Sequence, residues 1–524
     1  MSFVVPTDPV ERLSLPPLPQ ADPCVLVIFG ASGDLTQRKL VPALYDLACV
    51  GCMNPCFEVI GVGRTPMSSE QFRDRMRQAV ASSKDVGSFS DSGWQSFSER
   101  LHYLPGDIND LSFFSKLAGQ LDQMQRAGAS PNHLFYASTP AAQALPIIAG
   151  LGAAGLARQQ QGWSRIVLEK PFGRDLASAR ELNRVVLEVF EEEALFRIDH
   201  YLGKETVQNI LVFRFGNSVF EPVWNRNYVE YVEITAAETL GVEHRAAFYE
   251  ETGALRDMLA NHLLQLLALT AMEPPVAFDA DSVREQKVQV FRSIRPMDAE
   301  EVAQRTVRGQ YGLGKVGGKT LPGYREEPGV NPASITETYT AVELYLDNWR
   351  WAGVPFYLRA GKRLSAPVTE IRVHFKRTPQ ALFARTPHER IDRNEIALRI
   401  QPNEGISIAF GAKRPGAQMQ TVTVNADFSY ARAFAGDAPA AYETLLLDVM
   451  RGDATLFTRR DEVEAEWGII TPIQEAWSES PAPFPNYPAG TNGPEDADRL
   501  LLRHGHRWRD LTADPSQGLR EEES

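Results

Sequence analysis

The sequence predicts an α/β domain followed by an α+β domain. Up to about residue 200, β-rich apolar runs alternate with helical segments, the pattern of a doubly wound parallel sheet. Beyond residue 200, strand-like runs follow one another more densely, as in a larger, mostly antiparallel sheet backed by helices. With 524 residues, the chain is long enough for two to four domains.

Four apolar runs and one helical run define the first domain. Residues 24–29 (CVLVIF) are typical of a parallel strand that is buried on both faces. Residues 39–48 have leucines at helical spacing, and residues 57–63 form the second predicted strand. Further strands are expected at residues 133–137 and 165–168.

The second domain is predicted from seven strand-like runs and one long helix. Residues 255–272 are rich in leucine and contain neither glycine nor proline, so we expect a helix that packs on the sheet. Residues 312–332 are rich in Gly and Pro and are expected to form a long surface loop. The strand-like runs are residues 230–235, 341–346, 355–358, 371–375, 396–400, 406–410 and 420–424.

These patterns divide the chain into four parts. Residues 1–21 are proline-rich and lack an apolar run, so we expect a flexible N-terminal arm rather than a secretion signal. The first domain is assigned to residues 22–198 and the second to residues 199–510. Residues 511–524 contain three consecutive glutamates and are expected to form a flexible acidic tail.

Composition argues against several classes of function. The formal net charge of −13 disfavours a general nucleic-acid binder, and the longest apolar stretches are too short to cross a membrane. Four cysteines do not make a disulfide scaffold, so a cytoplasmic location is expected. Cys49, Cys52 and Cys56 are spaced as in some metal sites, but a structural zinc site needs four ligands. No metal site is therefore predicted.

A glycine turn follows the first strand directly and opens a helix. A dinucleotide pyrophosphate binds at this place in a Rossmann-like domain, because exposed N–H groups and the helix dipole favour an anion. The Gly-x-x-Gly spacing differs from the usual fingerprint, so this segment alone is equally compatible with an ordinary turn. The turn consists of Gly30, Ala31, Ser32, Gly33, Asp34 and Leu35.

The end of the second strand indicates which dinucleotide would bind. A fold that prefers NAD places an acidic residue there, whereas this strand ends in glycine followed by Arg64. An arginine suits the 2′-phosphate of NADP, and Ser32 and Lys39 could assist it. The sequence therefore predicts NADP as the cofactor.

Residues 197–205 (RIDHYLGKE) concentrate several reactive side chains in one short segment. If the segment is helical, His200 and Lys204 lie on one face with Tyr201 beside them, and together they could clamp a phosphate monoester. A salt-bridged helix surface is the alternative interpretation.

This segment resembles the active-site signature of the glucose-6-phosphate dehydrogenase family. Other segments resemble the family in the same order, over roughly residues 22–510, and a chance match of so many is negligible. They are the glycine turn, EKPFG at residues 169–173, WNR at 224–226, RDM at 256–258, NHLLQ at 261–265, RGQY at 308–311, PGY at 322–324 and DNWRWAGVPF at 347–356.

The resemblance implies an enzyme that oxidises D-glucose 6-phosphate to 6-phospho-D-glucono-1,5-lactone while reducing NADP to NADPH. This reaction is the first step of the oxidative pentose phosphate pathway. His262 would be the general base that removes the proton of the C1 hydroxyl, and Asp199 would orient it. Histidine suits this role because it titrates nearest to neutral pH. Without these partners, a histidine in a leucine-rich helix would be interpreted as a buried core residue.

The resemblance also implies which residues bind the ligands. His200, Tyr201 and Lys204 would hold the 6-phosphate of the sugar. Lys170, at the carboxyl end of a predicted parallel strand, would bridge cofactor and substrate, and the Lys170–Pro171 bond would be cis. The other contacts implied are Glu238, Asp257 and Lys362 with the sugar, and Asp107 and Ile108 with the adenosine part of the cofactor.

One position departs from the family pattern. Relatives usually have a second basic residue five positions beyond Lys362, where this chain has Pro367. The loss of this contact predicts weaker binding of the phosphosugar by about 1–2 kcal/mol. Arg363 could replace it, although adjacent strand residues point to opposite faces. Relatives often have a charged residue in a structural NADP site where this chain has Val368.

The resemblance also implies that the second domain binds the substrate and forms a homodimer or homotetramer through its broad sheet. No nucleic-acid or membrane partner is expected. Two alternative functions are compatible with the sequence. The chain could oxidise another aldose phosphate or a free hexose, or it could be a catalytically silent NADP sensor; the intact Asp199, Lys204 and His262 argue against the sensor.

Overall fold

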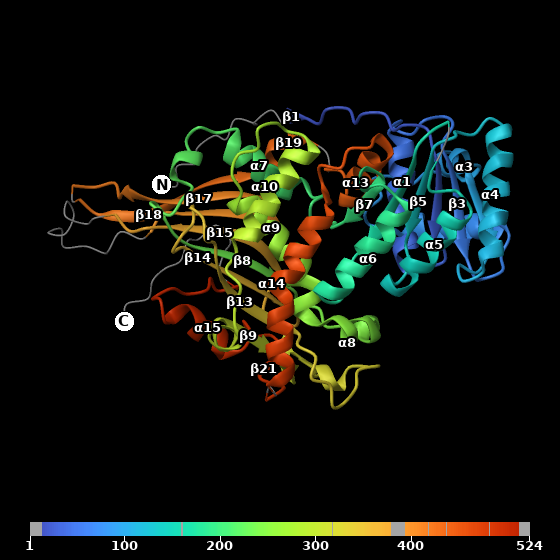
Figure 1. Cartoon of the computed structure of the whole chain (residues 1–524). Helices are drawn as coiled ribbons and strands as arrows, with labels where there is room; N and C mark the ends of the chain where they lie inside the picture. Colours follow the sequence, from blue (N-terminus) through green and yellow to red (C-terminus); the bar gives the residue numbers. More distant parts are fainter. Residues whose placement is uncertain are drawn as a thin grey trace.

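The structure is a computed structural model that describes residues 13–158, 161–316, 318–378, 393–417, 419–435, 438–480 and 483–512. The first part of the predicted N-terminal arm and the predicted acidic tail beyond residue 512 lie outside the described residues. Two large sheets lie at opposite ends of the molecule, with most of the helices between and around them (Figure 1).

The N-terminal sheet has seven strands in the order β20-β7-β6-β5-β2-β3-β4. The six strands from β2 to β7 pair in parallel, and the short β20 is antiparallel to β7. The direction of winding reverses between β2 and β5, which is where ligands bind in open α/β sheets. The bounds are β2 Val25–Phe29, β3 Glu58–Gly63, β4 Leu101–Pro105, β5 His133–Ala137, β6 Ser164–Glu169, β7 Leu195–Ile198 and β20 Phe457–Thr458.

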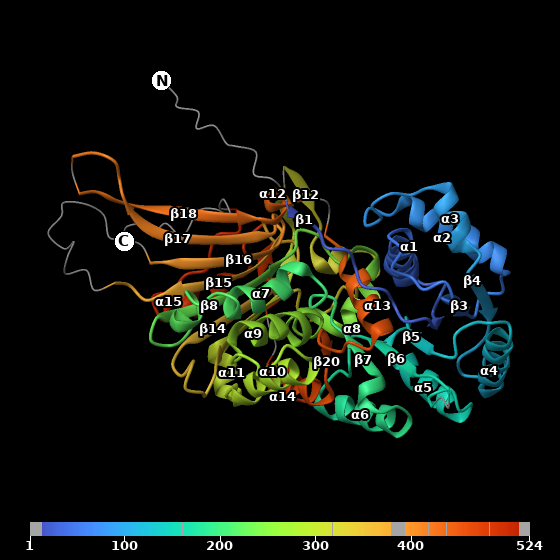
Figure 2. The same ribbon diagram turned by 90° about the horizontal axis from the view of Figure 1, so that it is seen from above.

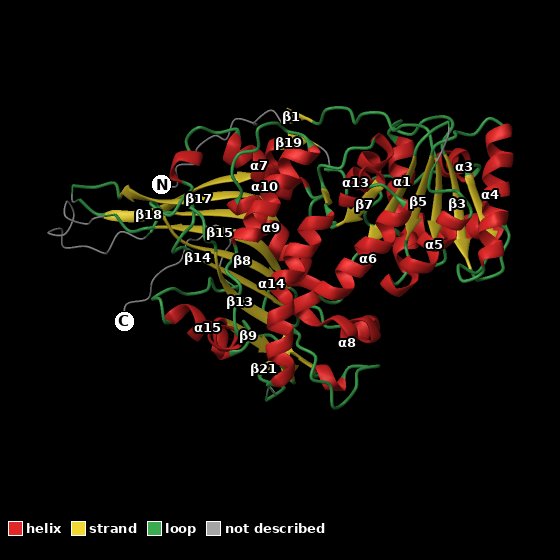
Figure 3. Ribbon diagram, in the orientation of Figure 1, coloured by secondary structure: helices red, strands yellow, loops and turns green. Residues whose placement is uncertain are grey.

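Helices cover both faces of this sheet, as expected for a doubly wound domain (Figure 3). Each crossover helix turns an apolar stripe toward the strands; in α4, for example, the four residues Phe113, Phe114, Leu117 and Leu121 are buried. The helices are α1 Val41–Cys49, α2 Ser69–Ser82, α3 Asp91–Ser98, α4 Leu111–Arg126, α5 Ala144–Ala153 and α6 Leu176–Val189.

The second sheet has eight strands in the order β18-β17-β16-β15-β8-β14-β13-β9. All neighbouring pairs are antiparallel except β8 and β14, which are parallel. The predicted combination of a parallel and a mostly antiparallel sheet is therefore confirmed. The bounds are β8 Val229–Ala237, β9 Thr306–Gly309, β13 Tyr339–Tyr345, β14 Pro355–Gly361, β15 Val368–Phe375, β16 Glu395–Gln401, β17 Gly405–Lys413 and β18 Thr421–Ser429.

A group of helices packs on one face of the second sheet (Figure 2). The predicted long helix at residues 255–272 is present, but it begins as a π-helical segment, η6 (Leu255–Leu263), and continues as α9 (Leu264–Ala271). This element is buried along almost its whole length, so its polar side chains lie inside the protein. The neighbouring helices are α7 Glu205–Phe215, α10 Ala280–Ser293, α11 Ala299–Arg305 and α14 Arg460–Glu479.

The chain returns to the N-terminal sheet near its end. Helix α13 (Ala441–Arg451) packs against α1, and β20 follows it and extends the sheet. Near the N-terminus, β1 (Leu13–Ser14) pairs with β19 (Phe434–Ala435), and Ala21 N then donates to Cys52 O at 2.8 Å. The segment between them spans the distance from the second domain to the first (Figure 1).

The predicted surface loop at residues 312–332 is wrong in part. It contains the hairpin of β11 (Gly314–Val316) and β12 (Lys319–Leu321), and Tyr324 is fully buried. The glycines of this segment allow close packing: a Cβ on Gly314 would lie 2.0 Å from Ala489 O. Among the described helices, none combines the length and the apolar character needed to cross a membrane.

Candidate active site

The glycine turn lies at the carboxyl end of β2, where the winding of the sheet reverses. Gly30 N and Ala31 N both donate to Val62 O of β3, at 3.0 and 2.9 Å, which folds the turn over the neighbouring strand. Gly30 has φ +84°, and a Cβ there would lie 2.1 Å from Ser138 O, so this position requires glycine. The turn therefore brings backbone to the edge of the sheet with no side chain at Gly30 in the way.

The rest of the turn leads into a helical segment. Gln37 Nε2 donates to the carbonyl oxygens of Ser32 and Gly33, at 2.8 and 3.0 Å, and these two hydrogen bonds hold the turn in place. Asp34 is exposed and Leu35 is half-buried. An anion at this helix start would be favoured by the helix dipole.

Arg64 lies just beyond β3, next to the same turn. It is exposed and has no ion-pair partner among the described residues. Ser32 Oγ lies 3.4 Å from the point where a Cβ on Gly63 would be, so a hydroxyl and a guanidinium flank the strand end. Lys39, by contrast, is paired with Asp85 at 2.5 Å. An unpaired cation where NAD-binding folds have an acid fits the 2′-phosphate of NADP.

The segment after β4 lies beside the end of β3, because Gly106 N donates to Gly63 O at 3.0 Å. Asp107 is exposed and accepts hydrogen bonds from Asn109, at 3.0 Å from the backbone N–H and 2.9 Å from the side-chain amide. Ile108 is buried in the core with Phe113. Both predicted adenosine contacts are thus at the sheet edge, with Ile108 facing inward.

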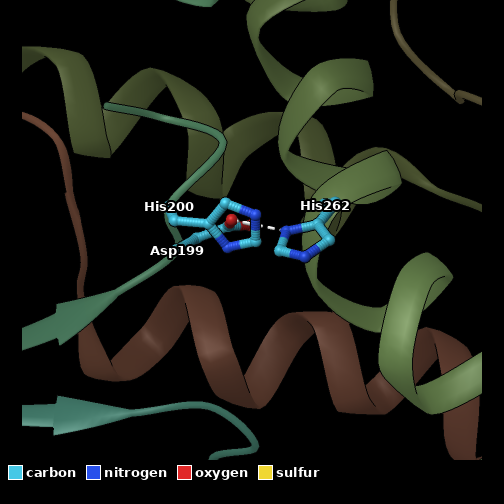
Figure 4. A group of neighbouring side chains, drawn as sticks. All are labelled: Asp199, His200 and His262. Atoms are coloured by element: carbon cyan, nitrogen blue, oxygen red, sulfur yellow. Dashed lines mark hydrogen bonds and ion pairs between the residues drawn. The ribbon is translucent and has the colours of Figure 1, made fainter. Parts of the chain in front are cut away.

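His262 and Asp199 form a buried pair (Figure 4). His262 Nδ1 lies 2.5 Å from Asp199 Oδ1, which also accepts a hydrogen bond from Tyr201 N at 2.9 Å. Burial alone would raise the pKa of Asp199, but His262, His200 and Lys170 hold it well below its usual range. Burial lowers the pKa of His262 although Asp199 opposes the effect, so the imidazole is neutral at pH 7.

Lys170, directly after β6, completes the group. Its Nζ lies 2.9 Å from Asp257 Oδ1, 3.0 Å from Asp257 O and 2.8 Å from His262 Nε2. Because an ammonium group only donates, Nε2 must be the acceptor nitrogen and Nδ1 must carry the proton toward Asp199. The Lys170–Pro171 bond is cis.

The π-helical segment explains how Asp257 and His262 reach the same ammonium group. Residues five apart do not share a face of an α-helix, whereas the i→i+5 bonding of a π-helix brings them close to one side. Burial alone would raise the pKa of Asp257, but the positive charges of Lys170 and Lys362 lower it. The resulting pKa lies far below the usual range of an aspartate.

The predicted phosphate residues come together, but not on a helix. Residues 200–204 form turns, and α7 begins at Glu205, so the condition of a helical segment, under which His200 and Lys204 would share a face, is not met. Instead, the Tyr201 ring stacks on the His262 ring at a centroid distance of 4.1 Å, and Lys204 Nζ lies 4.0 Å from the Tyr201 ring. Burial lowers the pKa of Lys204 to about 8.

The sugar-binding residues of the second domain lie at adjacent strand ends. Glu238 follows β8 and Lys362 follows β14, and because these two strands are parallel their carboxyl ends coincide. The two side chains form an ion pair. Arg363 is held by Glu327 at 3.1 Å, and Pro367 is exposed just before β15. Arg363 is thus engaged elsewhere.

Sequence reasoning missed several residues at the site. Gln401, at the end of β16, accepts a hydrogen bond from Lys204 Nζ at 2.6 Å. Tyr136 and Tyr442 donate to Glu169 at 2.6 and 3.2 Å, next to Lys170. The Glu169 carboxyl lies at the end of β6 and was visible within the EKPFG segment, but Gln401 and Tyr442 belong to no short motif.

A group that could hold a metal ion is formed by Asp199, His200 and His262, whose ligand atoms lie within 4.8 Å of one another. The ammonium of Lys170 beside His262 disfavours a cation there, and the group is already hydrogen-bonded as a proton-transfer pair. The cysteines at positions 24, 49, 52 and 56 are free.

Comparison with known proteins gives matches over most of the chain. Two family models match: "Glucose-6-phosphate dehydrogenase, NAD binding domain" over residues 27–209 and "Glucose-6-phosphate dehydrogenase, C-terminal domain" over residues 211–509. Glucose-6-phosphate 1-dehydrogenase of Aggregatibacter actinomycetemcomitans is 46% identical over 94% of this chain and 98% of its own length. The glucose-6-phosphate 1-dehydrogenase of Treponema pallidum (strain Nichols) is 46% identical over 93% of this chain and 95% of its own length.

Solved structures agree. A glucose-6-phosphate dehydrogenase in complex with its substrate glucose-6-phosphate has a TM-score of 0.85 and 35% identity, covering 94% of this chain and all of that one. The glucose-6-phosphate 1-dehydrogenase from Mycobacterium avium has a TM-score of 0.80 and 37% identity, and the match covers 94% of this chain and 99% of that one. The chain belongs to the glucose-6-phosphate dehydrogenase family.

Proposed function

We propose that the protein oxidises D-glucose 6-phosphate to 6-phospho-D-glucono-1,5-lactone with NADP as the electron acceptor. The observation that carries the proposal is the buried His262–Asp199 pair, with 2.5 Å between Nδ1 and Oδ1, beside Lys170 at the end of a strand of the dinucleotide-type sheet. Relatives 46% identical over nearly the whole chain carry this activity in their names.

His262 is the general base in this proposal. Its Nδ1 proton is held by Asp199, so Nε2 carries no proton and can accept that of the C1 hydroxyl. The imidazolium that forms is stabilised by the Asp199 carboxylate, which stays ionised throughout. Bound NADP supplies the hydride acceptor.

Lys170 links the two halves of the reaction. It holds Nε2 of His262 at 2.8 Å, so the substrate hydroxyl must replace the ammonium group at this atom. Asp257 keeps Lys170 within reach at 2.9 Å. We infer that the displaced ammonium group then lies between sugar and cofactor and orients both.

The remaining predicted contacts divide by the part of the substrate or cofactor that they would bind. His200, Tyr201 and Lys204 would bind the 6-phosphate, with Gln401 orienting Lys204. Glu238, Asp257 and Lys362 would bind the sugar hydroxyls. At the cofactor end, the glycine turn with Asp107 and Ile108 would hold the dinucleotide, and Arg64 with Ser32 would hold the 2′-phosphate.

A homodimer or homotetramer built through the second sheet is part of the proposal. Strand β18 is at the edge of this sheet, and its residues are half-buried or exposed. Phe410, Met419 and Val422 are exposed apolar residues on or beside β17 and β18. Such an edge is suited to a two-fold contact. A cytoplasmic location is also proposed, since free thiols suit a reducing compartment.

The proposal is tested by following NADPH formation with the wild type and with His262→Asn. The variant should lose about 10²–10⁴-fold in kcat, the usual contribution of a general base, while binding NADP normally. Glucose and other aldose phosphates are compared with glucose 6-phosphate by kcat/KM. No NADPH from saturating glucose 6-phosphate, with NADP still bound, would instead favour the silent sensor. A higher kcat/KM for another aldose would mean that this aldose, and not glucose 6-phosphate, is the main substrate.

A further inference from the structure

Helix α14 contacts both segments that carry the reacting groups. Trp467 Nε1 donates to Phe172 O at 2.9 Å, two residues after Lys170. The preceding residue, Glu466, accepts a hydrogen bond from Gln265 Nε2 at 2.5 Å. Gln265 lies three residues after His262 on the same continuous helical element. The bond to Glu466 therefore anchors the element that carries the proposed base.

Glu466 belongs to a buried cluster with Gln265, Lys287 and Glu462, none of which is more than 4% exposed. Lys287 Nζ is paired with Glu462 Oε2 at 2.7 Å. Glu462 and Glu466 are one turn apart on α14, so they lie on the same face. The cluster therefore holds two carboxyl groups and one cation, and that cation is taken by Glu462.

We propose that Glu466 is a positioning residue for the reaction: as an uncharged carboxylic acid, it binds Gln265 and fixes the helical element that carries His262. The proposal rests on the proposed function, in which His262 is the base. It concerns a buried acid that the mechanism above does not use.

Hydrogen-bond accounting within the described part of the chain supports an uncharged acid. Gln265 Oε1 is a buried acceptor of this cluster without a hydrogen-bond partner. A protonated Glu466 brings one O–H donor to this region, whereas an ionised one brings none. Two buried carboxylates with one cation cannot both ionise cheaply, and burial together with Glu462 raises the pKa of Glu466 well above its usual range.

An uncharged Glu466 also preserves the charge balance around the proposed base. A further negative charge behind Asp199 would favour the imidazolium form and so remove the free base at neutral pH. The titratable groups that face His262 are Asp199, Asp257, Lys170, His200 and Tyr201. These groups already include two carboxylates and only one ammonium group. An ionised Glu466 would add a third negative charge and would favour the imidazolium form of His262.

The experiment compares Glu466→Gln, Glu466→Ala and Glu475→Gln. Glutamine mimics the neutral acid and can still accept from Gln265, alanine removes the bond, and Glu475 is an exposed residue on the same helix. We expect Glu466→Gln to keep kcat within about twofold and to leave the acid limb of the pH profile of kcat/KM unmoved. Glu466→Ala should lower kcat about tenfold or more with little change in KM, because His262 loses its alignment. Glu475→Gln should match the wild type.

A second readout does not depend on activity. The infrared spectrum of the cofactor-free wild type minus that of Glu466→Gln should show the C=O band of one protonated carboxylic acid at pH 7. A carboxylate band in this difference, or an acid limb that moves to lower pH in Glu466→Gln, would show an ionised Glu466 and overturn the proposal. So would wild-type kcat in Glu466→Ala. An inactive wild type would refute the proposed function instead, and the infrared difference would still decide the charge of Glu466.

Discussion

Lys170 Nζ lies 2.8 Å from His262 Nε2, the atom that takes the substrate proton in the proposed mechanism. Residue types and the family resemblance predicted this group from the sequence. They did not predict the bond itself, because Lys170 follows β6 of one domain and His262 belongs to the helices of the other. Gln401 and Tyr442 were missed for a similar reason: each reaches the site only through the tertiary fold.

The charge of Arg64 should determine the choice of cofactor. Arg64→Ala removes paired, charge-assisted hydrogen bonds to a 2′-phosphate, each worth about 1.5–3 kcal/mol, so KM for NADP should rise at least about tenfold. KM for NAD should change little, since NAD lacks this phosphate. Steady-state kinetics with both cofactors measures the ratio, with the exposed Arg126→Ala as a control. An equal effect on both cofactors would contradict the assignment.

The ammonium group of Lys204 should make phosphosugar binding sensitive to alkaline pH. Its pKa is lowered to about 8 by burial, so the group is charged below pH 8 and becomes neutral as the pH rises above it. KM for glucose 6-phosphate should therefore increase above pH 8, whereas KM for unphosphorylated glucose should not. Lys204→Arg keeps the charge and should flatten the increase. A rise of equal steepness in this variant would assign the effect to another group.

Pro367 should limit the affinity for the phosphosugar. It is exposed just before β15, near the Lys362–Glu238 ion pair, and Arg363 beside them is held by Glu327. Pro367→Lys should lower KM for glucose 6-phosphate about 5- to 30-fold, the equivalent of about 1–2 kcal/mol. Pro367→Ala serves as the control, because it removes the proline without adding a cation. An unchanged KM in the lysine variant would remove this explanation.

At the level of elements, the sequence predicted strands that are apolar runs and missed those that are short or mixed. Strand β4 (LHYLP) carries a histidine and a proline within five residues, so its pattern is weak. Strand β20 has two residues, and no periodicity can be read from two. Its existence depends on pairing with Ile198 and Arg197 of β7, far away in the chain. The π-helical segment was also missed, because leucine spacing does not distinguish it from an α-helix.

Strand β20 should nevertheless contribute strongly to stability. Phe457 is fully buried and meets Phe196 of β7 edge to face at 4.9 Å. Phe457→Ala should lower the free energy of unfolding by about 3–5 kcal/mol through lost burial and a cavity. Urea denaturation measures this, with Phe278→Ala, which is 75% exposed, expected to change stability by less than about 0.5 kcal/mol. Similar stability of the two variants would show that β20 is dispensable.

On the scale of the whole molecule, one of the hydrophobic clusters joins the two domains. A single hydrophobic cluster includes Phe29 and Ile166 of the first sheet together with Leu263 and Ile371 of the second domain. Helix α14 contacts α6 on one side and η6 on the other, and α13 with β20 returns the chain to the first sheet. The sequence predicted two domains, but this continuity could not be read from it, because it arises from contacts between distant segments.

A shared hydrophobic cluster predicts that the domains unfold together. Separate domains would give two thermal transitions, and NADP would move only the one that belongs to the N-terminal domain. Here we expect one main calorimetric transition that NADP shifts as a whole, since a ligand at 100 times its Kd stabilises the folded state by about 2.7 kcal/mol. Differential scanning calorimetry with and without NADP makes the comparison, and Arg64→Ala should require more NADP for the same shift. Two resolved transitions, of which NADP moves only the first, would mean that the contacts through α14 and β20 do not couple the domains.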